Sequence, residues 1–433
     1  MQPPDHPPLR ITTPDKLPLF GDFFFAGFEG TACRNALHQW IDQIEATQHD
    51  TQVDADYRRL REVGIHAARD CIRWPQVDRH SHYEFTSVDP FVAASQRHGI
   101  QVVWDLFHYG YPEDLDPFSE AFPRRFEAYS SAVANYVRSR QDPPYYFTPV
   151  NEPSFLAWAG AEVGRFGPHL RGRGPEFKLA LVRAAIAGIN AIRSVIPEAR
   201  MVNVDPLCHV IPGREPGASQ GDAGDFNGRA VYEAWDMISG RILPELGGSP
   251  AHLDIVGVNY YWTNQWEIGR EEQPLALDDP ARVPLRDLLR EVWTRYGAEI
   301  LLTETAHAGE MRPIWLREVA ADCEAALDDG IPLRGVCLYP ILGMPEWHDR
   351  ERWARMGLWD LVDRGGVLDR QPYGPLVDAL CSARRRVRRF AGVDAGGMVS
   401  RVAAPAEDSV RAQSLGRREH LLDADGRERH ETA

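Results

Sequence analysis

The sequence lacks the features that mark several large classes of protein. Its six cysteines are scattered without any C-x-x-C pair, so neither a zinc site nor a disulfide framework is predicted. It has no run of about 18 apolar residues, the length that a membrane-spanning helix needs. The first residues have neither a basic start nor an apolar stretch, so no secretory signal is visible. We therefore expect a cytoplasmic protein with no membrane partner.

Positive charge is also in short supply. The chain has 48 Lys and Arg against 63 Asp and Glu, which gives a formal net charge of -15. Because phosphate backbones are bound by basic surfaces, we expect no nucleic acid partner. No His, Asp or Glu spacing resembles a metal-ligand set, so we predict no metal and no cofactor. The oligomeric state is left open.

Apolar residues, in contrast, are plentiful and regularly placed. Hydrophobic residues make up 43% of the 433-residue chain and aromatic residues 10%. Eight strand-like runs alternate with segments in which apolar residues recur at helical spacing. This alternation predicts an α/β fold of the (β/α)8 TIM-barrel class, a single domain with its active site at the C-terminal ends of the strands. The predicted strands are residues 23–29, 66–74, 101–108, 145–151, 200–210, 253–262, 299–305 and 333–341, and the clearest predicted helices are residues 56–63, 122–138, 177–195, 285–296 and 313–328.

The two ends of the chain differ in composition from the middle. Residues 1–18 are rich in proline and are predicted to run over the surface, while residues 19–392 are predicted to form the barrel. Residues 393–433 have little apolar periodicity, and such a composition cannot bury enough surface to offset the entropy lost on ordering. We predict that this tail is disordered; a tail that folds on a partner is the alternative.

Two glutamates stand in similar settings half a chain apart. Glu152 lies in Asn151-Glu152-Pro153 after an aromatic and β-branched run, and Glu304 follows the apolar run of residues 300–303. Carboxylates at the C-terminal ends of parallel strands face the mouth of a barrel, and a pair of them is the minimum needed to cleave a glycosidic bond. The pair makes the chain a candidate sugar-bond enzyme.

Other polar and aromatic residues fall at the same ends of the predicted strands. Arg69 interrupts the second strand, and an arginine beside Glu304 would hold that carboxylate ionised, although a purely structural ion pair is the alternative. Each of the remaining residues could by itself be core or rim packing. Their convergence on one end of the barrel is what an active site requires. They are His108 after strand three, Asn151 beside Glu152, Asn259 and Tyr261 at strand six, and Tyr339, Glu346 and Trp347 at or beyond strand eight.

This series of motifs resembles the family-1 glycoside hydrolases and their relatives in the same barrel clan. That family has an acid/base in Asn-Glu-Pro on strand four and a nucleophile in Thr-Glu-Asn-Gly on strand seven, which match Glu152 and Glu304. Its Arg-x-Ser-x-x-Trp and His-Trp-x-x-Pro motifs match stretches that begin at Arg69 and His108. The remaining matches are Asn259 and Tyr261 to Asn-Tyr-Tyr, Glu346 and Trp347 to a sugar-binding Glu-Trp, and Tyr339 to a tryptophan earlier in that loop.

The chain also departs from the family pattern. Thr-Glu-Asn-Gly has become Thr303-Glu304-Thr305-Ala306, and residues 340–345 replace the family's Ser-x-x-Asp-Asn-Phe. The family's N-terminal, sugar-binding glutamine has no clear match, and Glu29 is the nearest candidate. These changes concern the subsite for the terminal sugar. They therefore affect the prediction of the substrate more than the prediction of the reaction mechanism.

The resemblance implies a glycosidase, a β-glucosidase-like retaining glycoside hydrolase that acts on a β-linked terminal sugar by double displacement. Glu304 would be the nucleophile and Glu152 the acid/base, with a small-molecule glycoside or an oligosaccharide as substrate. One alternative is a transglycosidase, in which an acceptor hydroxyl replaces water; an apolar or aromatic acceptor site near Trp158, Phe166 and Trp262 would favour it. The other alternative is a carbohydrate-binding barrel that has lost catalysis.

Overall fold

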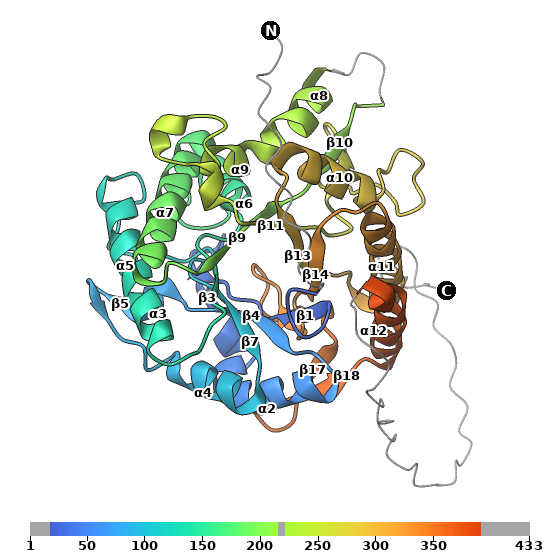
Figure 1. The fold of residues 1–433 in the computed structure, drawn as a ribbon, viewed down its shortest axis with the longest axis horizontal. Helices are drawn as coiled ribbons and strands as arrows, with labels where there is room; N and C mark the ends of the chain where they lie inside the picture. Colours follow the sequence, from blue (N-terminus) through green and yellow to red (C-terminus); the bar gives the residue numbers. More distant parts are fainter. Residues whose placement is uncertain (1–17, 215–220, 391–433) are drawn as a thin grey trace, which may run out of the picture. The chain divides into compact units, whose positions relative to one another are not determined.

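Eight parallel strands close into a barrel in the computed structural model, which describes residues 18–214 and 221–390 (Figure 1). The order around the barrel is β1-β14-β13-β11-β9-β8-β7-β4, so each barrel strand pairs with its neighbours in the sequence order and the first pairs with the last. This confirms the predicted (β/α)8 class. The barrel strands are β1 Phe24–Gly27, β4 Ala67–Cys71, β7 Gln101–Asp105, β8 Tyr146–Thr148, β9 Arg200–Pro206, β11 Ile255–Asn259, β13 Glu299–Thr305 and β14 Leu333–Leu338.

The strands are apolar on both faces because each face packs against a different core. In β1, Phe25 belongs to a core inside the barrel, whereas Phe24 belongs to the larger core between the sheet and the helices. In β13, Leu301 and Leu302 divide in the same way. A parallel sheet that is covered on both faces therefore gives continuous apolar runs in the sequence, which is why the strands could be recognised.

Helices surround the barrel and follow the strands around its outside (Figure 1). Two of them, α4 and α10, end at glycines with left-handed backbones, Gly99 (φ 59°) and Gly297 (φ 64°), where other residues would be strained. The long helices are α2 His49–Glu62, α4 Asp89–His98, α5 Ala121–Arg138, α7 Gly174–Val195, α10 Leu285–Tyr296, α11 Arg312–Asp328 and α12 Gly374–Val387. The short ones are α1 Gln43–Ala46, α3 Trp74–Val77, α6 Pro153–Ala157, α8 Gly221–Gly228 and α9 Glu233–Ile238.

Several short strands lie outside the barrel and form two-stranded sheets. They are β2 Ala32–Arg34 with β3 Trp40–Asp42, β5 Asp78–Arg79 with β6 His82–Tyr83, β10 His209–Ile211 with β12 Gln265–Glu267, β15 Met344–Pro345 with β16 Trp353–Ala354, and β17 Trp359–Asp363 with β18 Leu368–Pro372. The last two pairs belong to the connection between β14 and α12.

The fifth predicted strand is wrong in one respect. Residues 200–210 form two strands, because the chain leaves the barrel after β9 and pairs again as β10 with β12. Helix α8 lies beyond β10 in the chain. Asn227 ties this helix to β10 through hydrogen bonds with the backbone N–H and carbonyl of Val210, at 2.9 and 2.8 Å. Tertiary contacts here outweigh the low helix propensity of glycine.

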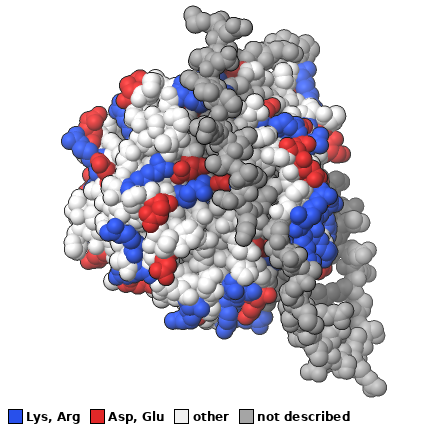
Figure 2. Space-filling view, viewed as in Figure 1, with Lys and Arg blue, Asp and Glu red and all other residues white. Residues whose placement is uncertain are grey.

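The described residues belong to one compact unit. The predicted domain boundaries at residues 18 and 392 stay predictions, and the predicted tail, residues 393–433, lies within residues 391–433, which are outside the described part of the chain, as are residues 1–17. None of the described helices is both long and apolar enough to cross a membrane. On the face drawn in Figure 2, basic and acidic side chains are interspersed.

Candidate active site

A buried cluster of polar side chains lies at the C-terminal ends of the barrel strands. Nine of the eleven residues predicted for the site belong to it, and their exposed fractions are 7% or less apart from the half-buried Tyr261. The members are Glu29 after β1, Arg69 in β4, His108 after β7, Asn151 and Glu152 after β8, Asn259 and Tyr261 at the end of β11, Glu304 in β13 and Tyr339 after β14.

The position of Glu304 depends on an irregularity at the end of β13. Val258 of β11 pairs with Leu302, but the next residue, Asn259, pairs with Glu304, so the register shifts by one residue. Strict alternation would place Glu304 on the same outer face as Leu302. A bulge of this kind re-aims a side chain, and here it lets Glu304 join the cluster.

Glu304 has a cation and a phenol as its partners. Arg69 Nη1 donates to one carboxylate oxygen at 2.6 Å, and the Tyr261 hydroxyl donates to the other at 2.8 Å. Burial raises the pKa of Glu304, whereas the positive charge of Arg69 acts in the opposite direction. Both oxygens thus receive hydrogen bonds that favour the ionised carboxylate.

Glu152 lies just beyond β8, where backbone hydrogen bonds to the neighbouring strands fix its position. Its φ of 47° is left-handed, a costly conformation for a residue other than glycine and one that is concentrated at functional sites. Its N–H donates to the Val204 carbonyl at 3.1 Å, while the N–H of Asn151 donates to the Phe107 carbonyl at 2.9 Å. Pro153 then begins α6, where its missing N–H costs nothing. These contacts with both neighbouring strands fix the direction of the Glu152 carboxyl group.

The partners of Glu152 are neutral. Asn259 Nδ2 donates to Oε1 at 2.8 Å, and the Tyr109 hydroxyl is hydrogen-bonded to Oε2. Burial, followed by the negative charge of Glu304, raises the pKa of Glu152 to about 8. Both effects favour the protonated form of this carboxyl group.

Arg69 contacts side chains from three other barrel strands or the residues that follow them. Besides Glu304, it donates to Asp105 Oδ2 and to Asn151 Oδ1, each at 2.6 Å, and it is 1% exposed. Burial would raise the pKa of Asp105, but Arg69 and His108 outweigh burial and lower it. The lowered pKa favours the ionised form of Asp105, which neutralises part of the charge of Arg69.

His108 lies at the centre of a second group of contacts. Its Nδ1 is 2.9 Å from Asp105 Oδ2, and its Nε2 is 3.4 Å from both Glu29 Oε1 and the Tyr339 hydroxyl. Burial favours the neutral ring, but Glu29 and Asp105 raise the pKa of His108. Gly27 makes room for the Tyr339 ring, because a Cβ on this residue would lie 2.1 Å from a ring carbon.

Two predicted residues lie apart from these contacts. Glu346 is half-buried and pairs with Arg352 at 3.0 Å. Trp347 packs edge-on against Tyr109 and Phe166, with ring centroids 6.0 and 5.4 Å apart. Trp347 therefore reaches the site through aromatic packing, and the sugar-binding role of Glu346 stays a prediction.

Sequence reasoning missed Asp105 and Tyr109 as members of the site. Asp105 follows Val102, Val103 and Trp104, so a charge that interrupts an apolar strand could have identified it. Tyr109 follows His108 where the resembled motif has tryptophan. Its hydroxyl bond to Glu152 joins residues 43 positions apart, which no local pattern shows.

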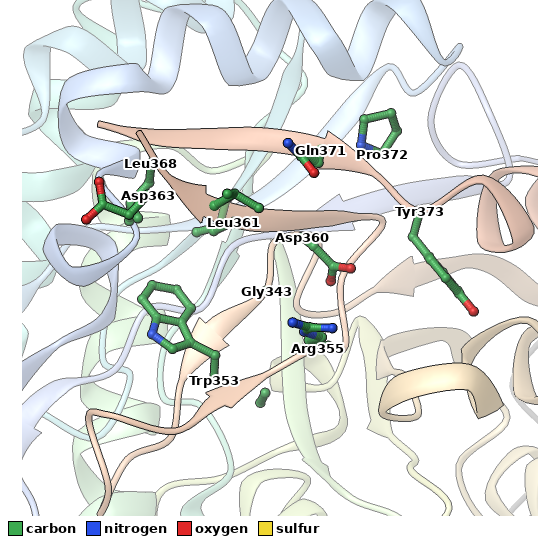
Figure 3. Close-up of a pocket in the computed structure, with 12 residues that line it drawn as sticks. Gly343, Trp353, Arg355, Asp360, Leu361, Asp363, Leu368, Gln371, Pro372 and Tyr373 are labelled. Atoms are coloured by element: carbon green, nitrogen blue, oxygen red, sulfur yellow. The ribbon is translucent and has the colours of Figure 1, made fainter. Parts of the chain in front are cut away.

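One cavity lies outside this cluster. It has a volume of about 460 Å³ and is bounded by the hairpins β15–β16 and β17–β18, with Trp353, Arg355 and Gln371 in its wall (Figure 3). Asp360, also in this wall, is already paired with Arg312 at 2.9 Å. None of its lining residues belongs to the polar cluster. Over residues 18–214 and 221–390, no three His, Cys, Asp or Glu side chains are grouped as metal ligands.

The closed parallel barrel, with its polar cluster at the strand ends, defines the chain as a (β/α)8-barrel protein. It is similar in structure to the family 1 β-glucosidase from Thermotoga maritima, with a TM-score of 0.67 and 16% sequence identity over 88% of this chain and 99% of that one. The same β-glucosidase in complex with glucoimidazole gives a TM-score of 0.69 and 17% identity over 87% and 100% of the two chains. Its complex with cyclophellitol gives 0.66 and 17% over 88% and 100%.

Sequence comparison adds no relative to these structures. No protein-family model and no curated protein sequence matches the chain. At 16–17% identity the structural likeness establishes a shared fold. The fold of this chain is therefore that of the family 1 β-glucosidases, and its activity has to be argued from its own residues.

Proposed function

We propose that the protein is a retaining glycoside hydrolase that releases a β-linked terminal sugar. One observation carries the proposal: two buried glutamates share a site but have partners of different charge, Arg69 and Tyr261 for Glu304 against Asn259 and Tyr109 for Glu152. Two carboxyl groups whose surroundings separate their protonation states have the division that acid and nucleophile require.

In the first step, Glu304 attacks the anomeric carbon while the bond from that carbon to the leaving oxygen breaks. Glu152 transfers its proton to the leaving oxygen, so the aglycone departs as a neutral alcohol. Arg69 and Tyr261 keep Glu304 ionised until it attacks. The product of this step is a glycosyl ester on Glu304, with Glu152 now a carboxylate.

In the second step, Glu152 acts as the base. It takes a proton from a water molecule, whose oxygen attacks the anomeric carbon and releases Glu304 as a carboxylate. Glu152 is then protonated again, and the sugar has the configuration with which it entered. Two displacements at the same carbon are the reason for net retention.

The groups around His108 are the proposed contacts for the hydroxyl groups of the sugar. Glu29 offers an acceptor, the Tyr339 hydroxyl offers a donor or an acceptor, and His108 offers a ring nitrogen, all near one another. Asn259, which touches Glu152, is the proposed contact nearer the reacting carbon. The likeness to β-glucosidases in complex with glucoimidazole and cyclophellitol supports a β-linked glycone.

A panel of aryl β-glycosides tests the proposal. We expect release of the phenol from at least one of them, and ¹H NMR of the first sugar product should show the β-anomer before mutarotation. An α-anomer as first product would contradict the retaining mechanism. Failure on every β-glycoside would instead favour a carbohydrate-binding barrel without catalysis.

Transglycosylation is the second candidate, and an aromatic surface next to the acid/base favours it. Phe155 packs against Tyr109 and Trp158, with ring centroids 5.4 and 5.8 Å apart, and Trp158 is 41% exposed. Such a surface suits an apolar acceptor, which would take the place of water in the second step. Trp262 stacks on His307 at 4.2 Å. Product analysis with added alcohols separates transfer from hydrolysis.

A further inference from the structure

Tyr109 is a buried residue fixed against the acid/base. It is 2% exposed, its backbone is left-handed at φ 68°, and its ring lies 5.4 Å from Phe155 and 5.7 Å from Phe166 between centroids. Its hydroxyl bonds to Glu152 Oε2. A non-glycine residue held in this conformation indicates that the surrounding structure determines its position.

The partners of Glu152 decide which of its oxygens carries the proton. Asn259 reaches Oε1 through an amide N–H, which can only donate, so Oε1 acts as an acceptor. The proton of the neutral acid is therefore on Oε2, the oxygen that faces Tyr109. A hydroxyl group, unlike an amide N–H, can either accept that proton's hydrogen bond or donate one of its own.

We propose that Tyr109 is a positioning residue for the general acid, whose hydroxyl reverses its hydrogen bond with Glu152 during each half of the reaction. This inference rests on the proposed function. In the free enzyme, Oε2–H donates to the Tyr109 oxygen. Once substrate is bound, Oε2–H turns to the leaving oxygen and transfers its proton there, and the Tyr109 O–H turns to donate to Oε2 of the new carboxylate. In the second half, the water proton arrives on Oε2 and the bond reverses again.

The identity of the side chain supports this role. The resembled motif has tryptophan after its histidine, and an indole N–H is a donor only, so it could not accept from a protonated carboxyl group. The phenol can do both without moving its ring. Tyr109 thus stabilises the negative charge that develops on Glu152 as the proton leaves.

Tyr109→Phe tests the proposal through the leaving group. Alkyl β-glycosides need full protonation of the leaving oxygen, so we expect their kcat/KM to fall by about ten- to a hundredfold, the effect of one hydrogen bond to a charged group. The 2,4-dinitrophenyl glycoside needs little protonation and should lose less than about threefold. Because the Tyr109 bond lowers the pKa of Glu152, its removal should also move the alkaline limb of kcat/KM to higher pH.

A matched control separates this role from packing. Tyr129→Phe removes another buried phenol, whose hydroxyl donates to the Ile72 carbonyl at 2.7 Å away from the glutamates. It should reduce thermal stability without any dependence on the leaving group. An equal loss on all substrates in Tyr109→Phe, with an unmoved alkaline limb, would overturn the proposal.

Two further measurements keep the inference testable by itself. If Tyr109→Phe does not fold, 3-fluorotyrosine at position 109 preserves the packing and, as a stronger donor, should move the alkaline limb to lower pH; an unmoved limb would count against the role. A ¹³C NMR titration of Glu152 needs no turnover. A pKa of Glu152 that is unchanged in Tyr109→Phe would refute the inference, whereas absence of turnover in the unmodified enzyme would refute only the proposed function.

Discussion

The surroundings of Glu304 and of Glu152 differ in charge rather than in burial. Glu304 is 4% exposed and Glu152 is 6% exposed, yet only Glu304 has a cation, Arg69, in hydrogen-bond contact. Each carboxyl group is also hydrogen-bonded to one tyrosine hydroxyl, that of Tyr261 for Glu304 and that of Tyr109 for Glu152. Burial raises the pKa of both glutamates, and only Glu304 has an arginine whose charge lowers it again. In the proposed mechanism, this single arginine is what separates the anion from the acid.

The largest loss of activity is expected when the negative charge of Glu304 is removed. Glu304→Gln keeps the size of the side chain but cannot form the glycosyl ester, so kcat should fall by about 10⁴-fold or more on every substrate. Steady-state kinetics with an aryl glycoside measures the loss. Glu310→Gln, an exposed change outside the cluster, should keep full activity. Normal turnover in Glu304→Gln would show that the assignment is wrong.

Removal of the acid should give a loss that depends on the substrate. In Glu152→Ala, kcat/KM for alkyl glycosides should fall by about 10²- to 10⁴-fold, the range for general acid catalysis, with a much smaller fall for the 2,4-dinitrophenyl glycoside. Azide, which needs no base, should restore release of the sugar as a β-glycosyl azide. An α-glycosyl azide, or no rescue on activated substrates, would contradict the role of Glu152.

The pH profile tests the charge difference without any substitution. Glu152 must carry its proton to act as an acid, so activity is present below its pKa and is lost as pH rises through about 8. Above this value, kcat/KM for a poor leaving group should fall tenfold per pH unit. A profile that stays flat to pH 10 would show that no such acid operates. In Glu304→Gln, loss of the neighbouring charge should lower the pKa of Glu152, as measured by ¹³C NMR.

The smallest effect is expected from removal of the tyrosine hydroxyl that is hydrogen-bonded to Glu304. Tyr261→Phe removes one of the two hydrogen bonds to the proposed nucleophile and leaves Arg69 in place, so kcat should fall by about tenfold. The loss should be similar for all leaving groups, in contrast with Tyr109→Phe. A loss that grows with the pKa of the leaving group would place Tyr261 on the acid side instead.

Strand and helix periodicity was enough to predict the barrel, and the motifs were enough to predict most of the cluster. Asn151-Glu152-Pro153 and the run before Glu304 placed both glutamates at strand ends, where the structure has them. Periodicity could not predict how the side chains are aimed. The register shift at Asn259 and the left-handed backbone of Glu152 depend on the neighbouring strands, which no local window of sequence contains.

Contacts between residues that are far apart in the sequence could not be predicted either. In the sequence, Asp105 is only an aspartate at a strand end. Its importance comes from the hydrogen bond that it accepts from Arg69, which is 36 positions away. Arg69 was predicted as a partner of Glu304 because it interrupts the second strand, and the family motif has an arginine at the same place. Its bonds to Asp105 and Asn151 were not predicted. Charge balance in the pocket is therefore a property of the fold, since it is set by side chains from several strands.

The central claim is that Glu304 is the nucleophile and Glu152 is not. An activated 2-deoxy-2-fluoro-β-glycoside should inactivate the enzyme with time, and peptide mass spectrometry should locate one added sugar on Glu304. A label on Glu152 or on any other residue, or steady turnover of ordinary β-glycosides with no adduct at all, would contradict the claim.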